Sequence, residues 1–462
     1  MNDERLAIFS VAEPASEYGT DVKIDWIRFT NYRFFNGEFE LPVNGENLLI
    51  YGENGSGKST VYKALELLGE NQFTDFDDNL NIFAQEGETV EVEFGFSNSR
   101  ELIVSSDLEE MPDHVDFIKG LSIFKPMLDY KKMLRVHYDP EVNGDKINLY
   151  SMFRKLLSDY PFALKERELV KLSTITDFNL YFNSLEEVLK KYFLKPVNAF
   201  LDKYFQSDIF IEKFVCRTEI DEKSSMPTPI INLSIDYGDC LIDKYHTFLN
   251  EARLSALAIS IYMVAVKNLI ATLKTENLKI LVLDDLLISL DMSHRLKLLE
   301  ILKNEFADFQ IFFFTHDKEL YEIYKDKLNW KKYEFYLDDH DRIPGVILKQ
   351  GRSEIERAKM FYAQKEYEAC ALMLRKGFEK TLKSYLTPSE QRNQNYEELN
   401  LAGMIARALS KSSGECENVL RQLNSERRHI LNPLCHVDPK TIHSDELKNA
   451  IRDFEKLKDL IR

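Results

Sequence analysis

The sequence has few cysteines, no apolar run long enough to cross a membrane and no secretory leader. Its five cysteines, at positions 216, 240, 370, 416 and 435, include no CxxC pair. This pattern excludes a dense disulfide framework and a zinc knuckle, and it indicates a reduced, cytoplasmic chain. The N-terminal residues lack a basic stretch followed by an apolar core. The longest apolar region, 254–266, contains serines and is too short to span a bilayer, so we expect a buried helix there.

An excess of positive charge is also missing. The net charge is −17, which argues against a surface that is basic all over, although a local basic groove stays compatible with it. The 462 residues are enough for two or three domains with cores of their own. Internal repeats and low-complexity tracts are absent as well. The composition therefore predicts a soluble, multidomain globular protein.

A glycine-rich segment reading GENGSGKST follows an apolar run at 47–51 and precedes a helical pattern at 60–68. Strand, loop and helix in this order predict a P-loop, whose backbone N–H groups and helix N-terminus bind phosphate. We expect Lys58 to reach the β- and γ-phosphates of ATP and Ser59 to hold Mg²⁺. The predicted nucleotide-contacting residues of this loop are Gly52, Glu53, Asn54, Gly55, Ser56, Gly57, Lys58, Ser59 and Thr60.

A second candidate functional segment is the apolar run at 279–283, which is followed by Asp284 and Asp285. A buried strand ending in acid is typical of a Walker B segment, whose first carboxylate orients Mg²⁺ and whose next acid can polarise the attacking water. Alone this pattern is weak. Two neighbours strengthen it: a Ser-Leu-Asp run ending at Asp291, and a Thr-His-Asp run containing His316 at the end of the next buried strand.

The order of these motifs resembles that of an ABC-type ATPase head, and most closely the SMC/RecF-like branch. The Asn-Tyr-Arg turn at 31–33 and the GENGSGKST loop are similar to segments of that branch. The resemblance implies that Asp284 is the Walker B acid, Asp291 the D-loop acid and His316 the switch histidine near the γ-phosphate. It also implies that Arg33 contacts the nucleotide, and that ATP is hydrolysed between two subunits. We therefore expect a homodimer or a higher even oligomer.

Two departures from that family pattern stand out. Asp285 occupies the position of a catalytic glutamate and is one methylene shorter, so we expect slow hydrolysis. The ABC signature LSGGQ is replaced by LNEAR at 249–253. Asn250 can still cap a helix there, and Arg253 puts a fixed charge where glutamine is usual. An ordinary capped core helix is the alternative interpretation of this stretch. Gln85 and the segment 128–131 are weak candidates for the Q-loop.

The pattern between the two halves of the ATPase, from about 115 to 205, is mostly helical, followed by strands at 210–220 and 229–237. It is too short for the long heptad arm of a condensin-type protein. We predict an α/β fold, a bipartite ABC-type head with a short helical insertion and a C-terminal all-helical domain. The expected divisions are an N-terminal lobe at 1–164, the insertion with its strands at 165–245, a C-terminal lobe at 246–350 and a helical domain at 351–462.

The last domain is marked by amphipathic helices at 353–386 and 444–461. It also contains an Arg/His cluster in which Arg428 and His436 are seven residues apart with Pro433 between them. HEPN-type RNases place such a pair closer together. The alternative to a nuclease site is a helix end whose Arg and His dock a partner. Elsewhere the sequence contains no evident metal-nuclease cluster.

The phrases at 249–257 and 283–295 resemble those of compact anti-phage ATPases, namely the Septu ATPase subunit and retron-associated ATPases. The resemblance covers 22–350 and implies an ATPase that controls a separately encoded nuclease of HNH type, docked on 351–462, with nucleic acid reached through the complex. One alternative is a stand-alone RecF-like DNA-repair ATPase, which the charge disfavours. Another is an RNase that uses Arg428 and His436.

Overall fold

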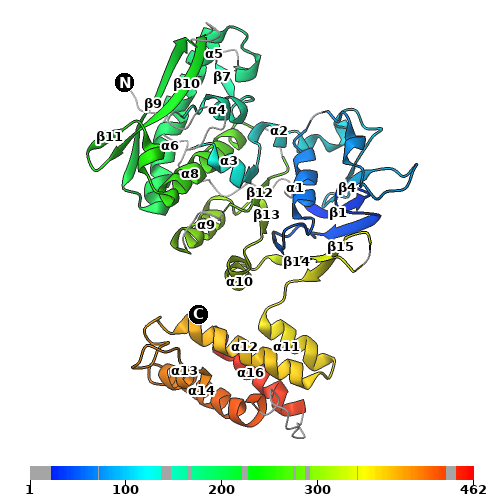
Figure 1. Ribbon diagram of the computed structural model, residues 1–462, viewed down its shortest axis with the longest axis vertical. Coiled ribbons are helices and arrows are strands. Elements are labelled where there is room, and N and C mark those ends of the chain that lie inside the picture. The colour runs from blue at the N-terminus through cyan, green and yellow to red at the C-terminus, as the bar shows by residue number, and fades with distance from the viewer. Residues whose placement is uncertain are drawn as a thin grey trace. The chain divides into compact units, whose positions relative to one another are not determined.

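The chain folds into two compact units, each with a hydrophobic core of its own. The computed structural model describes residues 22–70, 72–136, 147–163, 169–220, 227–273, 277–286, 292–340, 342–432 and 444–461. Unit 1 comprises Met1–Tyr324 and Leu328–Lys349, and unit 2 comprises Lys325–Lys327 and Gln350–Arg462. The change in composition after Gln350 coincides with this boundary. Unit 1 is of the α/β class and unit 2 is built from helices (Figure 1).

A six-stranded sheet in the order β15-β14-β3-β13-β12-β6 forms the centre of unit 1. Each neighbouring pair from β14 to β6 is parallel. Strands β3 and β13 are buried along their whole length, which explains why the sequence shows continuous apolar runs there instead of alternation. The strands are β3 (Leu48–Gly52), β6 (Met127–Asp129), β12 (Ile280–Asp284), β13 (Gln310–Thr315), β14 (Lys331–Asp338) and β15 (Gly345–Gln350).

A second, antiparallel sheet in the order β2-β1-β4-β5 covers the N-terminal lobe. In β5 buried and exposed residues alternate, as expected when one face of a sheet is solvated. Its strands are β1 (Ile24–Thr30), β2 (Glu38–Pro42), β4 (Glu91–Phe96) and β5 (Glu101–Ser105). Helix α1 (Lys58–Leu67) follows β3 directly, as the strand–loop–helix pattern predicts.

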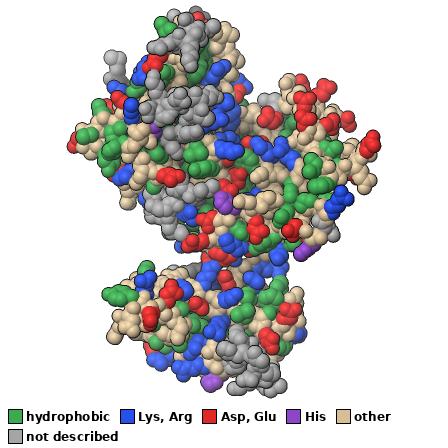
Figure 2. All heavy atoms as spheres, in the orientation of Figure 1, with side chains coloured by type: hydrophobic (Ala, Val, Ile, Leu, Met, Phe, Trp, Pro, Cys, Tyr) green, Lys and Arg blue, Asp and Glu red, His purple; other side chains and the backbone are tan. Residues whose placement is uncertain are grey.

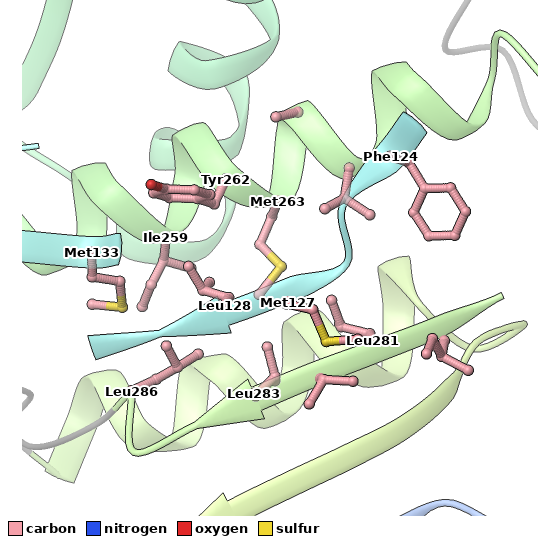
Figure 3. Close-up of a cluster of buried hydrophobic side chains, with 14 of the residues drawn as sticks. Phe124, Met127, Leu128, Met133, Ile259, Tyr262, Met263, Leu281, Leu283 and Leu286 are labelled. Atoms are coloured by element: carbon pink, nitrogen blue, oxygen red, sulfur yellow. The ribbon is translucent and has the colours of Figure 1, made fainter. Parts of the chain in front are cut away.

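Among the described residues the segment between 115 and 205 is mostly helical, as expected, and strand β6 is an element that the sequence analysis did not predict there. Its three residues pair in parallel with β12 and complete the central sheet. Figure 3 shows Met127 and Leu128 between the side chains of α8 (Glu251–Ile270), among them Met263, and those of β12, such as Leu281. A strand this short has no periodicity of its own, so only its tertiary neighbours specify it.

The rest of the segment between the two halves of the sheet is partly helical and partly β-structure. The strands predicted at 210–220 and 229–237 are present as β9 (Ile209–Ile220) and β10 (Pro227–Tyr237). They form a long hairpin, to which β11 (Cys240–Ile242) adds a third strand. A small hairpin joins β7 (Pro161–Ala163) and β8 (Leu169–Lys171). The helices are α2 (Leu121–Phe124), α3 (Tyr130–Leu134), α4 (Tyr150–Leu156), α5 (Phe178–Val188), α6 (Leu194–Phe200) and α7 (Tyr245–Phe248).

Helix α8 is the central helix of unit 1. It is long and apolar enough to cross a membrane by length and composition, but 78% of its apolar window is buried within the protein. It therefore behaves as a core helix, as the sequence predicted. Helices α9 (Met292–Glu305) and α10 (Lys318–Lys327) follow β12 and β13 respectively.

Unit 2 contains more helices than the sequence indicated. The segment 353–386 is two helices because the chain turns at Lys365, whose φ of 65° is left-handed. There the N–H of Glu366 donates to the carbonyl of Phe361 (2.9 Å), a bond that closes a helix C-terminus. The helices are α11 (Glu354–Ala363), α12 (Tyr367–Tyr385), α13 (Leu401–Leu409), α14 (Gly414–Glu426) and α16 (Ser444–Leu460).

Candidate nucleotide site

The carboxyl ends of four parallel strands bring the predicted ATPase residues to one edge of the central sheet. Register places Asp284 of β12 beside Phe314 of β13 on one side and beside Asp129 of β6 on the other. The P-loop leaves β3 at the same edge, because Ile50 pairs with Phe314. In open parallel sheets this edge is where ligands bind. Segments separated by more than 200 residues in sequence thus meet in one site.

The loop at 52–57 has the conformation of a phosphate cradle. Gly55 and Gly57 have φ of 81° and 94°, which favour glycine. A Cβ on Gly52 would lie 2.5 Å from Ser56 Oγ, so only glycine fits there. Helix α1 starts without a side-chain cap and without an acid in its first turn, which leaves its N-terminus able to bind an anion.

Ser56 supplies a further sign that the loop is built for a ligand. Its Oγ is buried, yet it has no hydrogen-bond partner among the described residues. An unsatisfied buried hydroxyl is costly, and a phosphate oxygen would satisfy it. The uncapped helix and this hydroxyl are the features expected of a nucleotide's phosphate site, so the residues present fit ATP.

Lys58 lies within the cradle and is almost fully buried. Its Nζ donates to the carbonyls of Gly52 (2.6 Å) and Glu53 (3.0 Å). Burial lowers the pKa of Lys58, against the opposing effect of Asp285, Asp284 and Glu53. The ammonium is thus held by neutral carbonyls and nearby acids, and a phosphate would give it a closer anionic partner.

Asp284 lies at the last position of β12 and is mostly buried. Burial is the first cause that raises the pKa of Asp284 to about 7, and the charge of Asp285 adds to it. Lys58 and His316 act in the opposite direction. A carboxylate in such surroundings gains from a cation, which fits the Mg²⁺ that would be shared by Asp284 and the exposed Ser59.

Asp285 and His316, the two predicted catalytic residues, are in direct contact. Asp285 Oδ1 accepts a hydrogen bond from the backbone N–H of His316 (2.9 Å) and lies 2.8 Å from its Nδ1. Asp285 has a φ of 50°, a left-handed conformation in which aspartate and asparagine are enriched. The left-handed backbone therefore gives a physical reason for aspartate at this position.

Asp129 is a site residue that the sequence analysis named only as part of a weak Q-loop candidate. Its Oδ2 accepts a hydrogen bond from the hydroxyl of Tyr62 in α1 (3.0 Å), and its Oδ1 accepts one from the N–H of Lys132 (2.8 Å). Its charge contributes to the raised pKa of Asp284. The sequence did contain a sign of this strand: two apolar residues follow Pro126 and precede Asp129, which is a short version of the apolar run and acid of β12.

The turn containing Arg33 packs against the P-loop. A Cβ on Gly57 would lie 3.0 Å from the rings of Phe34 and Phe35, so the turn and the loop are in close contact. Arg33 itself is exposed, with a φ of 50°, and its Nε donates to Asn79 Oδ1 (2.9 Å). The structure thus places Arg33 on a turn next to the cradle, and its contact with nucleotide stays a prediction.

Asn250 and Arg253 stand at the start of α8. Asn250 Oδ1 accepts from the N–H of Arg253 (2.9 Å), which is the predicted N-cap. The guanidinium of Arg253 forms a bidentate ion pair with Asp208 (2.8 and 2.5 Å). It also lies over the ring of Tyr237. Arg253 therefore links α8 to the β9–β10 hairpin, while a role for either residue toward a second subunit stays a prediction.

Other predicted residues lie elsewhere or outside the described residues. Gln85 is exposed, and its N–H donates to Glu88 (2.9 Å). Asp291 and His436 lie outside the described residues, as do the neighbours of Asp291 in the Ser-Leu-Asp run. Arg428 is exposed on the π-helical turn η7 (Arg427–Leu431) of unit 2. The structure thus brings together the P-loop, Asp284, Asp285 and His316, but does not test the D-loop or RNase predictions.

No protein-family model and no curated protein matches the sequence. Solved structures to which the chain is similar include SMC head domains. One is an Smc head bound to the C-winged helix domain of ScpA (10% identity, TM-score 0.40, 71% of this chain and 98% of that chain). Others are the SMC head domain from Thermotoga maritima (11%, 0.35, 71% and 100%) and an Smc head with an extended coiled coil bound to the C-terminal domain of ScpA, derived from Pyrococcus furiosus (10%, 0.39, 75% and 100%). At such low identity the likeness concerns the fold alone, and the roles proposed below rest on the residues of this chain.

Proposed function

We propose that the protein binds ATP with Mg²⁺ and hydrolyses it. The observation that carries this proposal is the meeting of a phosphate cradle, an acid with a raised pKa and a contacting Asp–His pair at one edge of a parallel sheet. The buried Ser56 hydroxyl, which has no hydrogen-bond partner among the described residues, also supports the proposal, because a phosphate oxygen would give it one.

Each group has a defined task in this proposal. The loop and Lys58 bind the phosphates, and Ser59 with Asp284 hold Mg²⁺, which neutralises charge as the phosphoryl group is transferred. Asp285 orients and polarises water, while His316 fixes the Asp285 carboxylate through the contact at 2.8 Å.

The proposed working form is a dimer in which the start of α8 of one copy faces the P-loop of the other. Two features support it. The family resemblance implies this arrangement, and the side chain of Asn250 is exposed at the start of α8. The altered signature and Asp285 favour a slow switch over a motor.

The proposed biological role is that of a regulatory ATPase subunit in a cytoplasmic anti-phage complex, with unit 2 docking an HNH-type nuclease. It rests on the resemblance of the segments at 249–257 and 283–295 to compact defence ATPases. It also rests on unit 2, a separate helical unit with its own core. Purification of the protein from its native host tests this role: a nuclease retained by the full chain and lost when unit 2 is removed supports it. Salt-dependent binding of double-stranded DNA by the protein alone would favour the RecF-like alternative.

Lys58→Ala tests the nucleotide site. We expect ATP binding, measured by calorimetry, to fall by at least about 100-fold, because charge-assisted contacts to phosphate are lost. Lys63→Ala is the matched control, since Lys63 lies on the same helix and pairs with Glu66 at the surface. Equal ATP affinity in the two variants would remove the basis of the proposal.

A further inference from the structure

A cleft of about 890 Å³ lies in unit 1, apart from the P-loop. It is lined by residues of α4, of the short turn at Leu172–Thr174 and of the start of α5. None of its described lining residues belongs to 52–60. Its volume falls within the range of small-molecule sites, and nothing in the ATPase mechanism uses it.

The charge of the cleft contrasts with that of the chain. Its described lining contains the three cations Lys125, Arg154 and Lys155 and no Asp or Glu, although the net charge of the protein is −17. Arg154 and Lys155 are exposed, and within the described ranges neither pairs with a carboxylate. In Figure 2, Lys and Arg side chains gather across the middle of unit 1, whereas Asp and Glu gather on the lobe of β4. Such a cleft attracts anions.

Lys125 is fixed within this cleft. Its Nζ donates to the carbonyl of Lys155 (2.6 Å) and to the hydroxyl of Ser158, and it lies 3.5 Å from Asp159. Burial lowers the pKa of Lys125 more than Asp159 raises it. The ammonium is therefore held in place with its charge incompletely balanced, which an anionic ligand would correct.

The remaining walls supply hydroxyl groups and aromatic rings. Ser151, Ser173 and Thr176 are exposed and offer hydrogen-bond donors beside the cations. Tyr150 and Tyr181 stand edge to face, with ring centroids 6.5 Å apart. Cations with hydroxyl groups suit phosphate oxygens, and aromatic rings suit the face of a base.

We propose that this cleft binds a nucleoside phosphate, as a second site independent of the P-loop. The ligand is either a free nucleotide or one unit of a single strand, because both present the same phosphate, sugar and base. A second cavity of about 480 Å³ shares Lys125 and Lys155 with the cleft and adds Lys132 and Arg135, but also Glu66 and Glu70. Lys132 lies 3.5 Å from Glu66, so the cations of this second cavity are partly balanced by acids.

The test uses the full-length chain carrying Lys58→Ala, in which binding at the P-loop is expected to be at least about 100-fold weaker. Two probes are titrated at physiological ionic strength: AMP by calorimetry, and a fluorescein-labelled oligothymidylate by fluorescence anisotropy. We expect at least one probe to bind saturably. Adding Arg154→Glu and Lys155→Glu should weaken that binding by at least about tenfold, because repulsion replaces two phosphate contacts.

The matched control adds Lys448→Glu and Lys456→Glu, two exposed lysines of unit 2 that produce the same change in net charge. Its affinity should stay within about twofold, and thermal melts should show that all variants are folded. Binding of AMP identifies a free nucleotide as the ligand, and binding of the oligonucleotide alone identifies a strand. Absence of binding by both probes, or equal losses in the control, would overturn the proposal. The nucleotide site at the P-loop would be unaffected by that result.

Discussion

At the scale of single residues, the main feature of the candidate site is that the fold holds several acidic side chains close together. Asp284 is influenced by the charges of Asp285 and Asp129 on one side and by those of Lys58 and His316 on the other. Asp129 also lies 3.7 Å from the ammonium of Lys132. Like charges that are buried side by side oppose folding unless a cation or a proton joins them. The site is therefore under electrostatic strain, which the proposed Mg²⁺ and nucleotide would relieve, and two substitutions test this directly.

Asp284→Asn should make the protein without Mg²⁺ more stable at high pH. The folded-state pKa of Asp284 is raised to about 7 from 3.8, so the neutral acid favours folding at low pH and that stability is lost as the pH rises through 7. Asparagine stays neutral. We expect a gain in the free energy of unfolding on the order of 2 kcal/mol above pH 8 and almost none near pH 4. Urea denaturation with a chelator present measures both, and a gain of the same size at both pH values would contradict this explanation.

Substitutions at Asp285 separate its backbone role from its chemistry. Asparagine tolerates the φ of 50° and keeps an oxygen acceptor for the N–H of His316, but it cannot act as a base. We expect Asp285→Asn to bind ATP normally and to hydrolyse it about 10²–10⁴-fold more slowly in single-turnover assays. Asp285→Ala should also trap ATP and so stabilise the dimer. Its free energy of unfolding should nevertheless be lower, since alanine disfavours the left-handed conformation at this position. Normal turnover in the asparagine variant would show that another group polarises the water.

At the scale of elements, the position of β6 decides the shape of the site. This strand of three residues connects the acid Asp129 to the sheet and packs between α8 and β12 (Figure 3). Its hydrogen bonds to β12 place Asp129 beside Asp284. Because β6 is short, side-chain packing contributes more to its position than the few ladder bonds do.

Leu128→Ala tests the role of β6. Leu128 is buried, so we expect a loss of about 2–5 kcal/mol in the free energy of unfolding and a weaker affinity for Mg²⁺-ATP as β6 shifts. Leu180→Ala is the control, since Leu180 is 44% exposed on α5 and should cost less than about 0.5 kcal/mol. If Leu128→Ala destabilised the protein but left nucleotide affinity intact, β6 would matter for stability alone.

At the scale of the whole molecule, the chain consists of two units with separate cores. The core of unit 1 contains the sheet and α8, and that of unit 2 contains residues of α11, α12, α13, α14 and α16. A separate core is the condition for folding alone. The residues of the proposed nucleotide site all belong to unit 1, and unit 2 has a core that does not depend on them.

A chain that ends at Lys349 should therefore keep its ATP affinity within about threefold, and residues 350–462 alone should be helical and melt cooperatively. Circular dichroism and calorimetry on the two pieces measure this. Aggregation of both pieces, or loss of nucleotide binding by the first, would show that the units depend on each other.

The P-loop, the strands that precede Lys58 and Asp284, and the change of composition at Gln350 could be predicted from the sequence, because they depend on local patterns of glycine and apolar residues. The break at Lys365, the helices α13 and α14, and β6 could not. The break at Lys365 depends on a single left-handed residue that is not glycine, and β6 has only three residues and therefore no period to detect.

The same division applies to the site. The sequence by itself determined which residues could bind phosphate and Mg²⁺, because glycine, lysine and aspartate at these spacings have few other uses. Only the tertiary structure decided that Asp285 touches His316, that Asp129 stands beside Asp284 and that Arg253 pairs with Asp208. The physical reason is that parallel register, a left-handed backbone and burial set these distances, and none of the three is encoded within a single segment of the chain.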